Sequence, residues 1–214
     1  SVQSGLLEDQ AAEQMKPFLH WCEHRRPIVT VKLAVDANGS VDDSSTESKR
    51  FTSEECLDEV HRLRMDCDAI LVGAETVERD DPSLTVRRIE TERQPLRVIL
   101  DPKERTNKDA KVYNDGGETI RIGREYNGLM PLLNRLGDIE KQRLLVEGGP
   151  ATIRGFLSEG LVDEFYLVQS RVEHCEPVPS NIDSDILERS GLVLNHEEQW
   201  GEESVQVWMR KLSQ

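Results

Sequence analysis

Short apolar runs alternate with amphipathic segments along most of the chain. The runs are rich in β-branched residues and have the length of buried strands. They occupy residues 28–35 (IVTVKLAV), 69–72, 96–100, 119–122, 143–146 and 164–168. Helical periodicity is present between them, at 54–64, 74–77, 129–136 and 153–157. Strands that alternate with helices predict an α/β domain with a mainly parallel central sheet flanked by helices.

The two ends of the chain have a different pattern. Residues 6–25 predict a helix, and Pro17 inside it favours a break into two short pieces. Residues 192–194 and 205–209 predict an antiparallel pair that closes the sheet. We therefore expect a helical extension at 1–26 and the main domain at 27–214. The polar stretch 36–49 and the Pro-rich stretch 173–190 are expected to be irregular surface loops.

Composition excludes several classes of protein. The chain has 214 residues and a formal net charge of −14, which argues against a nucleic-acid partner. No apolar run approaches the ~20 residues that a membrane helix needs. The 4 cysteines show no CxxC spacing, so we expect free thiols and no metal site. The expected location is cytoplasmic, or an organelle if a leader was removed before Ser1.

Candidate chemistry lies after the strands, where open α/β sheets bind their ligands. Gly73 ends one strand and Gly148-Gly149 follow another, and each turn leads into a predicted helix. Backbone N–H groups at such turns bind phosphate, and two turns in one sheet suit a dinucleotide. The alternative is that these glycines only permit tight packing. The sequence pattern leaves both interpretations open.

Charged residues supply two further candidates. Lys32 lies within an apolar strand, so it either points into a site, with Glu147 as a candidate partner, or reaches solvent from a sheet edge. The segment 80–87 (DDPSLTVR) places carboxylates, hydroxyls and a guanidinium close together. Arg87 has the geometry to hold a phosphate through two donors. A solvated turn begun by Asp-Pro is the alternative.

Longer motifs resemble a known family. VKLAV lies at 31–35, VHRLRMDCDAILVGAETVERDDPSLTVR at 60–87, PLRVILD at 95–101 and LLVEGGPATIRGFLSEGLVDEFYL at 144–167. In this order they resemble the pyrimidine reductase domain of riboflavin biosynthesis, which has a dihydrofolate-reductase-like fold. The resemblance extends from about residue 26 to 168. The DDPxLTxR and VEGG motifs in register are specific to this family.

The resemblance implies an NADPH-dependent enzyme that reduces the ribosyl group of a ribosylamino-pyrimidinone 5′-phosphate to ribityl. Such chemistry needs a proton donor beside the carbon that accepts the hydride. It also implies a homodimer with a small phosphorylated substrate. The implied catalytic residues are Lys32 and Glu147. Around the substrate it places Ser48, Arg64, Asp80, Leu84 and Arg87, and around the cofactor Gly73, Thr76, Gly148 and Gly149.

Three departures from the family pattern bear on the substrate. The segment 36–42 replaces SLDGKIA, the aromatic residue of SxWIT is lost or displaced by one place to Phe51, and His174-Cys175 stands where a Gly-Gly is common. Two alternatives therefore stay open: a reductase of the same fold with another substrate, and a catalytically dead binding or scaffolding homologue. The H-x-E and P-C-x-x-C motifs of the zinc deaminase half are missing, so we expect a stand-alone reductase.

Overall fold

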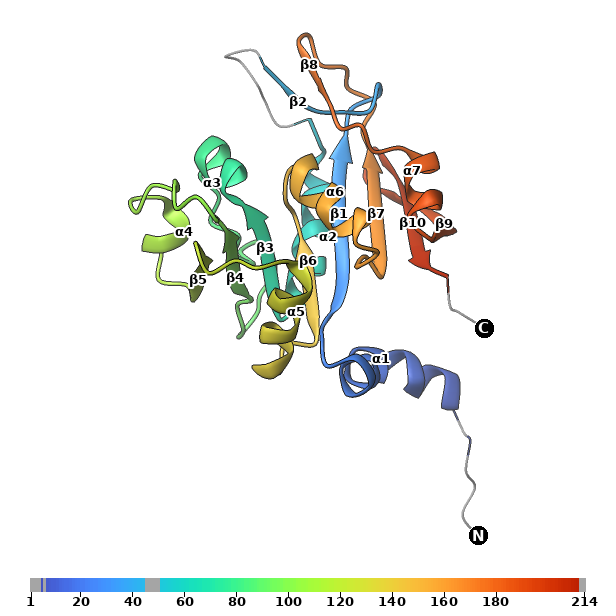
Figure 1. Cartoon of the computed structure of the whole chain (residues 1–214). Coiled ribbons are helices and arrows are strands. Elements are labelled where there is room, and N and C mark those ends of the chain that lie inside the picture. Colours follow the sequence, from blue (N-terminus) through green and yellow to red (C-terminus); the bar gives the residue numbers. More distant parts are fainter. Residues whose placement is uncertain (1–4, 6, 45–50, 212–214) are drawn as a thin grey trace.

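An eight-stranded sheet forms the centre of the protein, with strand order β5-β4-β3-β6-β1-β7-β10-β9 (Figure 1). The computed structural model describes residues 5, 7–44 and 51–211. The strands from β5 to β7 are parallel, and β10 and β9 are added antiparallel. The predicted mainly parallel sheet with a closing antiparallel pair is confirmed. The elements are α1 (Glu8–His24), β1 (Ile28–Val35), β2 (Ser40–Asp43), α2 (Glu54–Met65), β3 (Ala69–Gly73), α3 (Ala74–Asp80), β4 (Leu96–Leu100), α4 (Lys111–Asn114), β5 (Thr119–Ile122), α5 (Leu129–Asp138), β6 (Arg143–Val146), α6 (Pro150–Ser158), β7 (Glu164–Gln169), β8 (Pro177–Pro179), α7 (Ser184–Arg189), β9 (Leu192–Trp200) and β10 (Glu203–Arg210).

Both faces of the sheet are covered by helices, which explains the nearly continuous apolar runs. On one face, α5 and α6 pack against alternate residues of β1, among them Val29, Val31 and Leu33 (Figure 1). Successive side chains of a strand point to opposite faces, so Lys32 faces the other side. There α2 places Cys56 and Val60 in a cluster with β7 and β10. The fold thus directs the one charged residue of β1 towards α2.

Helix α2 begins at the N-cap Ser53, whose hydrogen-bond partners come from two different elements. The Ser53 hydroxyl accepts a hydrogen bond from the backbone N–H of Cys56 at 3.2 Å. In a capping box the reciprocal acceptor comes from within the helix, but here Glu203 of β10 accepts from the Ser53 N–H at 2.9 Å. The start of α2 is therefore tied to the antiparallel end of the sheet.

The N-terminal segment differs from its prediction. Helix α1 continues through Pro17 without a break. A proline removes only one helical hydrogen bond, and α1 has other support because the Trp21 indole donates to the Gly137 carbonyl at 2.8 Å. The Lys16 ammonium also contacts Glu164 at 2.8 Å. The division into a 1–26 extension and a 27–214 domain stays a prediction.

The two predicted irregular loops contain regular structure. Strands β2 and β8 pair antiparallel into a small second sheet, and α7 follows β8. The link between them is the Asp36 carboxylate, which accepts from the backbone N–H groups of Asn38, Ser40 and His174 at 2.8, 2.8 and 3.0 Å. Because this pairing joins residues far apart in sequence, local polarity did not reveal it.

Gly137 offers a test of how α1 docks on the body of the protein. A Cβ at this position would lie 2.1 Å from the Arg25 carbonyl oxygen. Gly137→Ala is therefore expected to lower the free energy of unfolding by about 1–3 kcal/mol despite the higher helix propensity of alanine. The control is Gly155→Ala in α6, where the nearest atom is 3.5 Å away, at Leu129. Urea denaturation of both variants measures the difference, and equal stabilities would contradict the close contact.

Candidate active site

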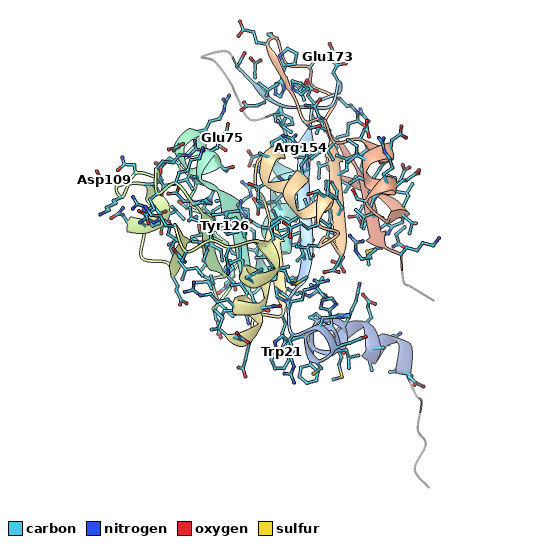
Figure 2. The ribbon with its side chains drawn as sticks, viewed as in Figure 1. Trp21, Glu75, Asp109, Tyr126, Arg154 and Glu173 are labelled. Atoms are coloured by element: carbon cyan, nitrogen blue, oxygen red, sulfur yellow. The ribbon has the colours of Figure 1, made fainter. Side chains whose placement is uncertain are left out.

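A cavity of about 840 Å³ opens at the carboxyl ends of β1, β3 and β6. These strands are neighbours and run parallel, so their ends meet at one edge of the sheet. Glu75, labelled on α3 in Figure 2, belongs to its lining. Every described residue of the predicted site lines this cavity: Lys32, Arg64, Gly73, Thr76, Asp80, Leu84, Arg87, Glu147, Gly148 and Gly149. Ser48 lies outside the described residues.

A buried ion pair between Arg64 of α2 and Glu147 at the end of β6 occupies the floor of the cavity. The guanidinium Nε and Nη2 donate to the two carboxylate oxygens, each at 2.7 Å. The side chains are only 12% and 9% exposed. Burial alone would raise the pKa of Glu147, but the charge and hydrogen bonds of Arg64, and then the charge of Lys32, lower it. Glu147 is therefore held as a carboxylate.

This pairing differs from the expected contact between Lys32 and Glu147. In the described part of the chain Lys32 forms no ion pair within 4.0 Å, and Glu147 is paired with Arg64 instead. The planar fork of Arg64 matches both carboxylate oxygens, which a lysine ammonium cannot do. Arg64 also donates to the Thr85 carbonyl at 3.3 Å, so few of its donors remain for a ligand. Its role as a substrate ligand stays a prediction.

The segment 81–87 is only partly solvated, because Leu84 and Val86 are buried whereas Arg87 is exposed. Ser83, Leu84 and Arg87 line the cavity, and Leu84 is buried in an apolar cluster. Asp81 and Leu84 have φ angles of 41° and 55°, a left-handed region that non-glycine residues seldom adopt. The fold must therefore hold this segment against a local conformational cost.

Asp80, at the end of α3, brings a carboxyl group to the same side of the cavity. Burial, and then the nearby charge of Asp42, raises the pKa of Asp80 above its ordinary value. Glu147 and Asp80 thus have opposite pKa shifts, because Glu147 faces a guanidinium whereas the buried Asp80 faces another acid. Glu147 is firmly ionised, and Asp80 is protonated more easily.

The glycines at the two turns have different reasons to be glycine. A Cβ at Gly73 would lie 2.7 Å from Thr152 Oγ1, and one at Gly148 would lie 2.9 Å from Thr152 Cβ. Tight packing on α6 therefore explains both. At Gly149 the nearest atom, Thr76 Oγ1, is 3.8 Å away. Gly149 is the N-cap of α6, which has no side-chain cap, so first-turn N–H groups are open to an anion.

Several cavity residues were missed by sequence analysis. Arg79 of α3 pairs with Asp42 of β2, and Lys111 of α4 contacts Asp81 at 3.1 Å. All of them line the cavity, as does Thr152. Thr152 belongs to the VEGGPAT motif and could have been found there. Arg79 lies in the motif at 60–87 and could also have been found there. Lys111 gave no signal, because only the folded chain brings α4 to this edge.

The departures from the family pattern meet at one place. The His174 ring packs edge-on against Phe51, with ring centroids 4.7 Å apart, and its backbone N–H donates to Asp36. Burial opposes ionisation of Asp36, but the backbone N–H groups of His174, Ser40 and Asn38 lower its pKa. Phe51 lines the cavity, whereas Asp36 and His174, the other members of this cluster, lie outside the lining.

Most of the chain is similar to one family of known proteins. The RibD C-terminal domain family matches residues 27–170. The chain belongs to this family. It is 36% identical over 182 residues to riboflavin biosynthesis protein RibD of Aquifex aeolicus, covering 76% of this chain and 51% of that protein. It is 34% identical over 173 residues to the 2,5-diamino-6-ribosylamino-4(3H)-pyrimidinone 5′-phosphate reductase of Archaeoglobus fulgidus, covering 65% and 78%.

Solved structures of RibD proteins agree with the fold. The Thermotoga maritima diaminohydroxyphosphoribosylaminopyrimidine deaminase/5-amino-6-(5-phosphoribosylamino)uracil reductase is 26% identical, with a TM-score of 0.84. The match covers 97% of this chain and 63% of that one. The predicted dihydrofolate-reductase-like α/β fold is confirmed. The chain spans about half the length of the RibD relatives from Aquifex aeolicus and Bacillus amyloliquefaciens, 51% in each case. No helix in the described ranges is long and apolar enough to cross a membrane.

The Arg64–Glu147 pair predicts a pH-dependent stability difference. Glu147→Gln leaves a buried guanidinium without its carboxylate, so we expect a loss of about 3–5 kcal/mol at pH 7. Because the folded-state pKa of Glu147 is below its ordinary value of 4.5, the pair stabilises the protein above that pH. The difference from the unsubstituted protein should shrink as the pH falls through the folded-state pKa.

Glu59→Gln is the matched control, because Glu59 pairs with Arg62 on the exposed face of the same helix. Exposed pairs contribute about 0–1 kcal/mol. Urea denaturation between pH 3 and pH 7 compares the two variants. A small, pH-independent effect of Glu147→Gln would show that the buried pair contributes little.

Proposed function

We propose that this protein is an NADPH-dependent reductase that converts the ribosyl group of a ribosylamino-pyrimidinone 5′-phosphate to ribityl in riboflavin biosynthesis. The main support is the convergence of Lys32, the Arg64–Glu147 pair, the 80–87 segment and both glycine turns on one cavity. The relative from Archaeoglobus fulgidus bears the name of a reductase of this substrate class. Family membership and cavity chemistry thus favour the same reaction.

The cavity suits the cofactor at its α6 side. Gly149, Pro150 and Ala151 line it there, and Pro150 takes the first helical position, where its missing N–H costs no helical bond. The uncapped first turn and the helix dipole favour a pyrophosphate. When bound, NADPH would supply the hydride. Gly149 and Thr76 would lie against it, and Gly73 and Gly148 would act by letting Thr152 approach closely.

Lys32 is the group best placed to hold a proton near the reacting carbon. It projects from β1 towards α2 and lines the cavity together with Glu147. Reduction of an opened ribosylamino group adds a hydride to carbon and a proton to nitrogen, so an ammonium beside that nitrogen completes the addition. Glu147, held ionised by Arg64, would accept hydrogen bonds from ribosyl hydroxyls. Lys32 and Glu147 together would thereby orient the sugar chain.

The remaining lining residues suit the other parts of the substrate. Arg87 would hold the 5′-phosphate, with Arg64 contributing charge. Asp80, whose pKa burial raises, would face polar groups of the pyrimidinone ring, and Leu84 would cover an apolar side. The second candidate function is a reductase of the same fold with a different substrate. The observation behind it is the cluster of Asp36, Phe51 and His174, which departs from the family pattern beside the cavity. A homodimer also stays a prediction, which light scattering at micromolar concentration would test.

The decisive assay follows NADPH oxidation by absorbance, with the deaminated and the undeaminated ribosylamino-pyrimidinone phosphate as substrates. We expect turnover with one of them, and Lys32→Met should lower kcat by about 10²-fold or more because the proton donor is lost. NADPH binding by this variant should be unchanged. Lys108→Met, at an exposed site, is the control. An unsubstituted protein that binds NADPH but oxidises it with neither substrate would refute the proposed reaction.

Gly149→Ala separates cofactor binding from packing. The new methyl group would have 3.8 Å to its nearest neighbour, so stability should change by less than about 0.5 kcal/mol. It would project where the pyrophosphate is proposed, and we expect the Kd for NADPH to rise by about tenfold. Gly155→Ala, in the same helix but outside the cavity lining, is the control. Fluorescence titration with NADPH measures both. An unchanged Kd would place the cofactor elsewhere.

A further inference from the structure

The cavity-lining segment 83–87 is held by side chains from other elements. It lies between α3 and β4 and belongs to no strand or helix. Arg97 of β4 donates to the Ser83 carbonyl at 2.9 Å. Gln94 makes two bonds to Val86, accepting from its N–H and donating to its carbonyl, both at 2.8 Å. These hydrogen bonds take the place of the backbone hydrogen bonds that a strand would form with its neighbour. They also offset the conformational cost of the positive φ at Leu84.

One further hydrogen bond joins the segment 83–87 to α2. The backbone N–H of Arg87 donates to Nδ1 of His61 at 3.2 Å. His61 precedes Arg64 by three residues, so the two side chains share one face of the helix. His61 is 2% exposed and is not part of the cavity lining. It therefore contacts the backbone of one cavity arginine and lies beside the other.

The bond requires a neutral imidazole. Nδ1 can accept a hydrogen bond only when it holds no proton, since a protonated histidine donates from both nitrogens. Burial, and then the charges of Arg64 and Arg87, lower the pKa of His61 to about 4. The two arginines therefore favour the state of His61 that accepts from Arg87.

We propose that His61 is a positioning residue that sets where Arg87 enters the cavity relative to Arg64, and so shapes the subsite for the substrate's phosphate. The N–H of Arg87 is bonded to the Cα that carries its side chain, so the contact with His61 helps to fix where that side chain begins. A shift there moves the guanidinium, because a long side chain amplifies a change at its backbone. This inference rests on the proposed function only in taking the anion to be a sugar phosphate.

The test compares His61→Leu, which removes the acceptor, with His61→Asn, whose side-chain oxygen can take the place of Nδ1. The binding probes are ribose 5-phosphate and ribose, and the kinetic probe is the turned-over nucleotide. We expect His61→Leu to raise the Kd for ribose 5-phosphate and the KM of the nucleotide by about tenfold. The value of kcat should stay within about twofold, and the Kd for NADPH should not change. His61→Asn should restore most of the affinity.

Gln94→Ala keeps the test valid if His61→Leu does not fold, because Gln94 is exposed and its loss loosens the same segment. Gln94→Ala should also raise the Kd for ribose 5-phosphate. His24→Leu on α1 is the control and should match the unsubstituted protein. An unchanged Kd for ribose 5-phosphate in His61→Leu, or equal weakening of ribose and ribose 5-phosphate, would overturn the proposal. So would a failure of His61→Asn to restore binding.

The outcomes also separate this inference from the proposed function. A protein that binds ribose 5-phosphate but reduces neither nucleotide would refute the reaction, and the binding constants of the His61 variants would still decide the positioning role. A protein that reduces a nucleotide but binds no ribose 5-phosphate would overturn the positioning role and leave the reaction intact.

Discussion

A buried guanidinium–carboxylate pair joins helix α2 to the end of strand β6, and the arrangement of the cavity depends on it. Arg64 and Glu147 come from segments 83 residues apart in the chain, and each would be costly to bury alone. Together they fix α2 over the carboxyl ends of the strands and keep the carboxylate ionised. The pair also leaves Lys32, on the neighbouring strand, without a protein partner within 4.0 Å in the described part of the chain.

The parallel sheet supplies the frame that makes this pair possible. Because β3, β6 and β1 are adjacent and parallel, the residues after each strand converge at one edge. Gly73 and Gly148 let Thr152 of α6 pack closely against two of these strand ends. The close packing brings the first turn of α6 to the cavity, where its uncapped N–H groups face the space proposed for a pyrophosphate. One edge of the sheet thus brings together the proposed anion site and Lys32, the proposed proton donor.

One cluster beside the cavity distinguishes this chain from the family pattern, and Phe51 is its cavity-lining member. Asp36, Phe51 and His174 each stand at a departure from that pattern, and the fold places them in contact. The small sheet of β2 and β8 is anchored through Asp36, and Arg79 connects β2 to α3. Neither contact within the cluster involves Arg64 or Glu147, so this cluster is separate from the buried ion pair.

The sequence by itself determined the strands of the main sheet, most of the helices that cover it and ten residues that line the cavity. Apolar runs such as 28–35 are buried on both faces, so their pattern is local and strong. The DDPSLTVR and VEGG motifs indicated the residues that line the cavity. Only the tertiary structure decided which charges pair, because the partner of Glu147 depends on how α2 crosses the sheet. It also decided the pairing of β2 with β8 and the bond between His61 and Arg87, since both join segments whose polar residues have no local preference for one partner.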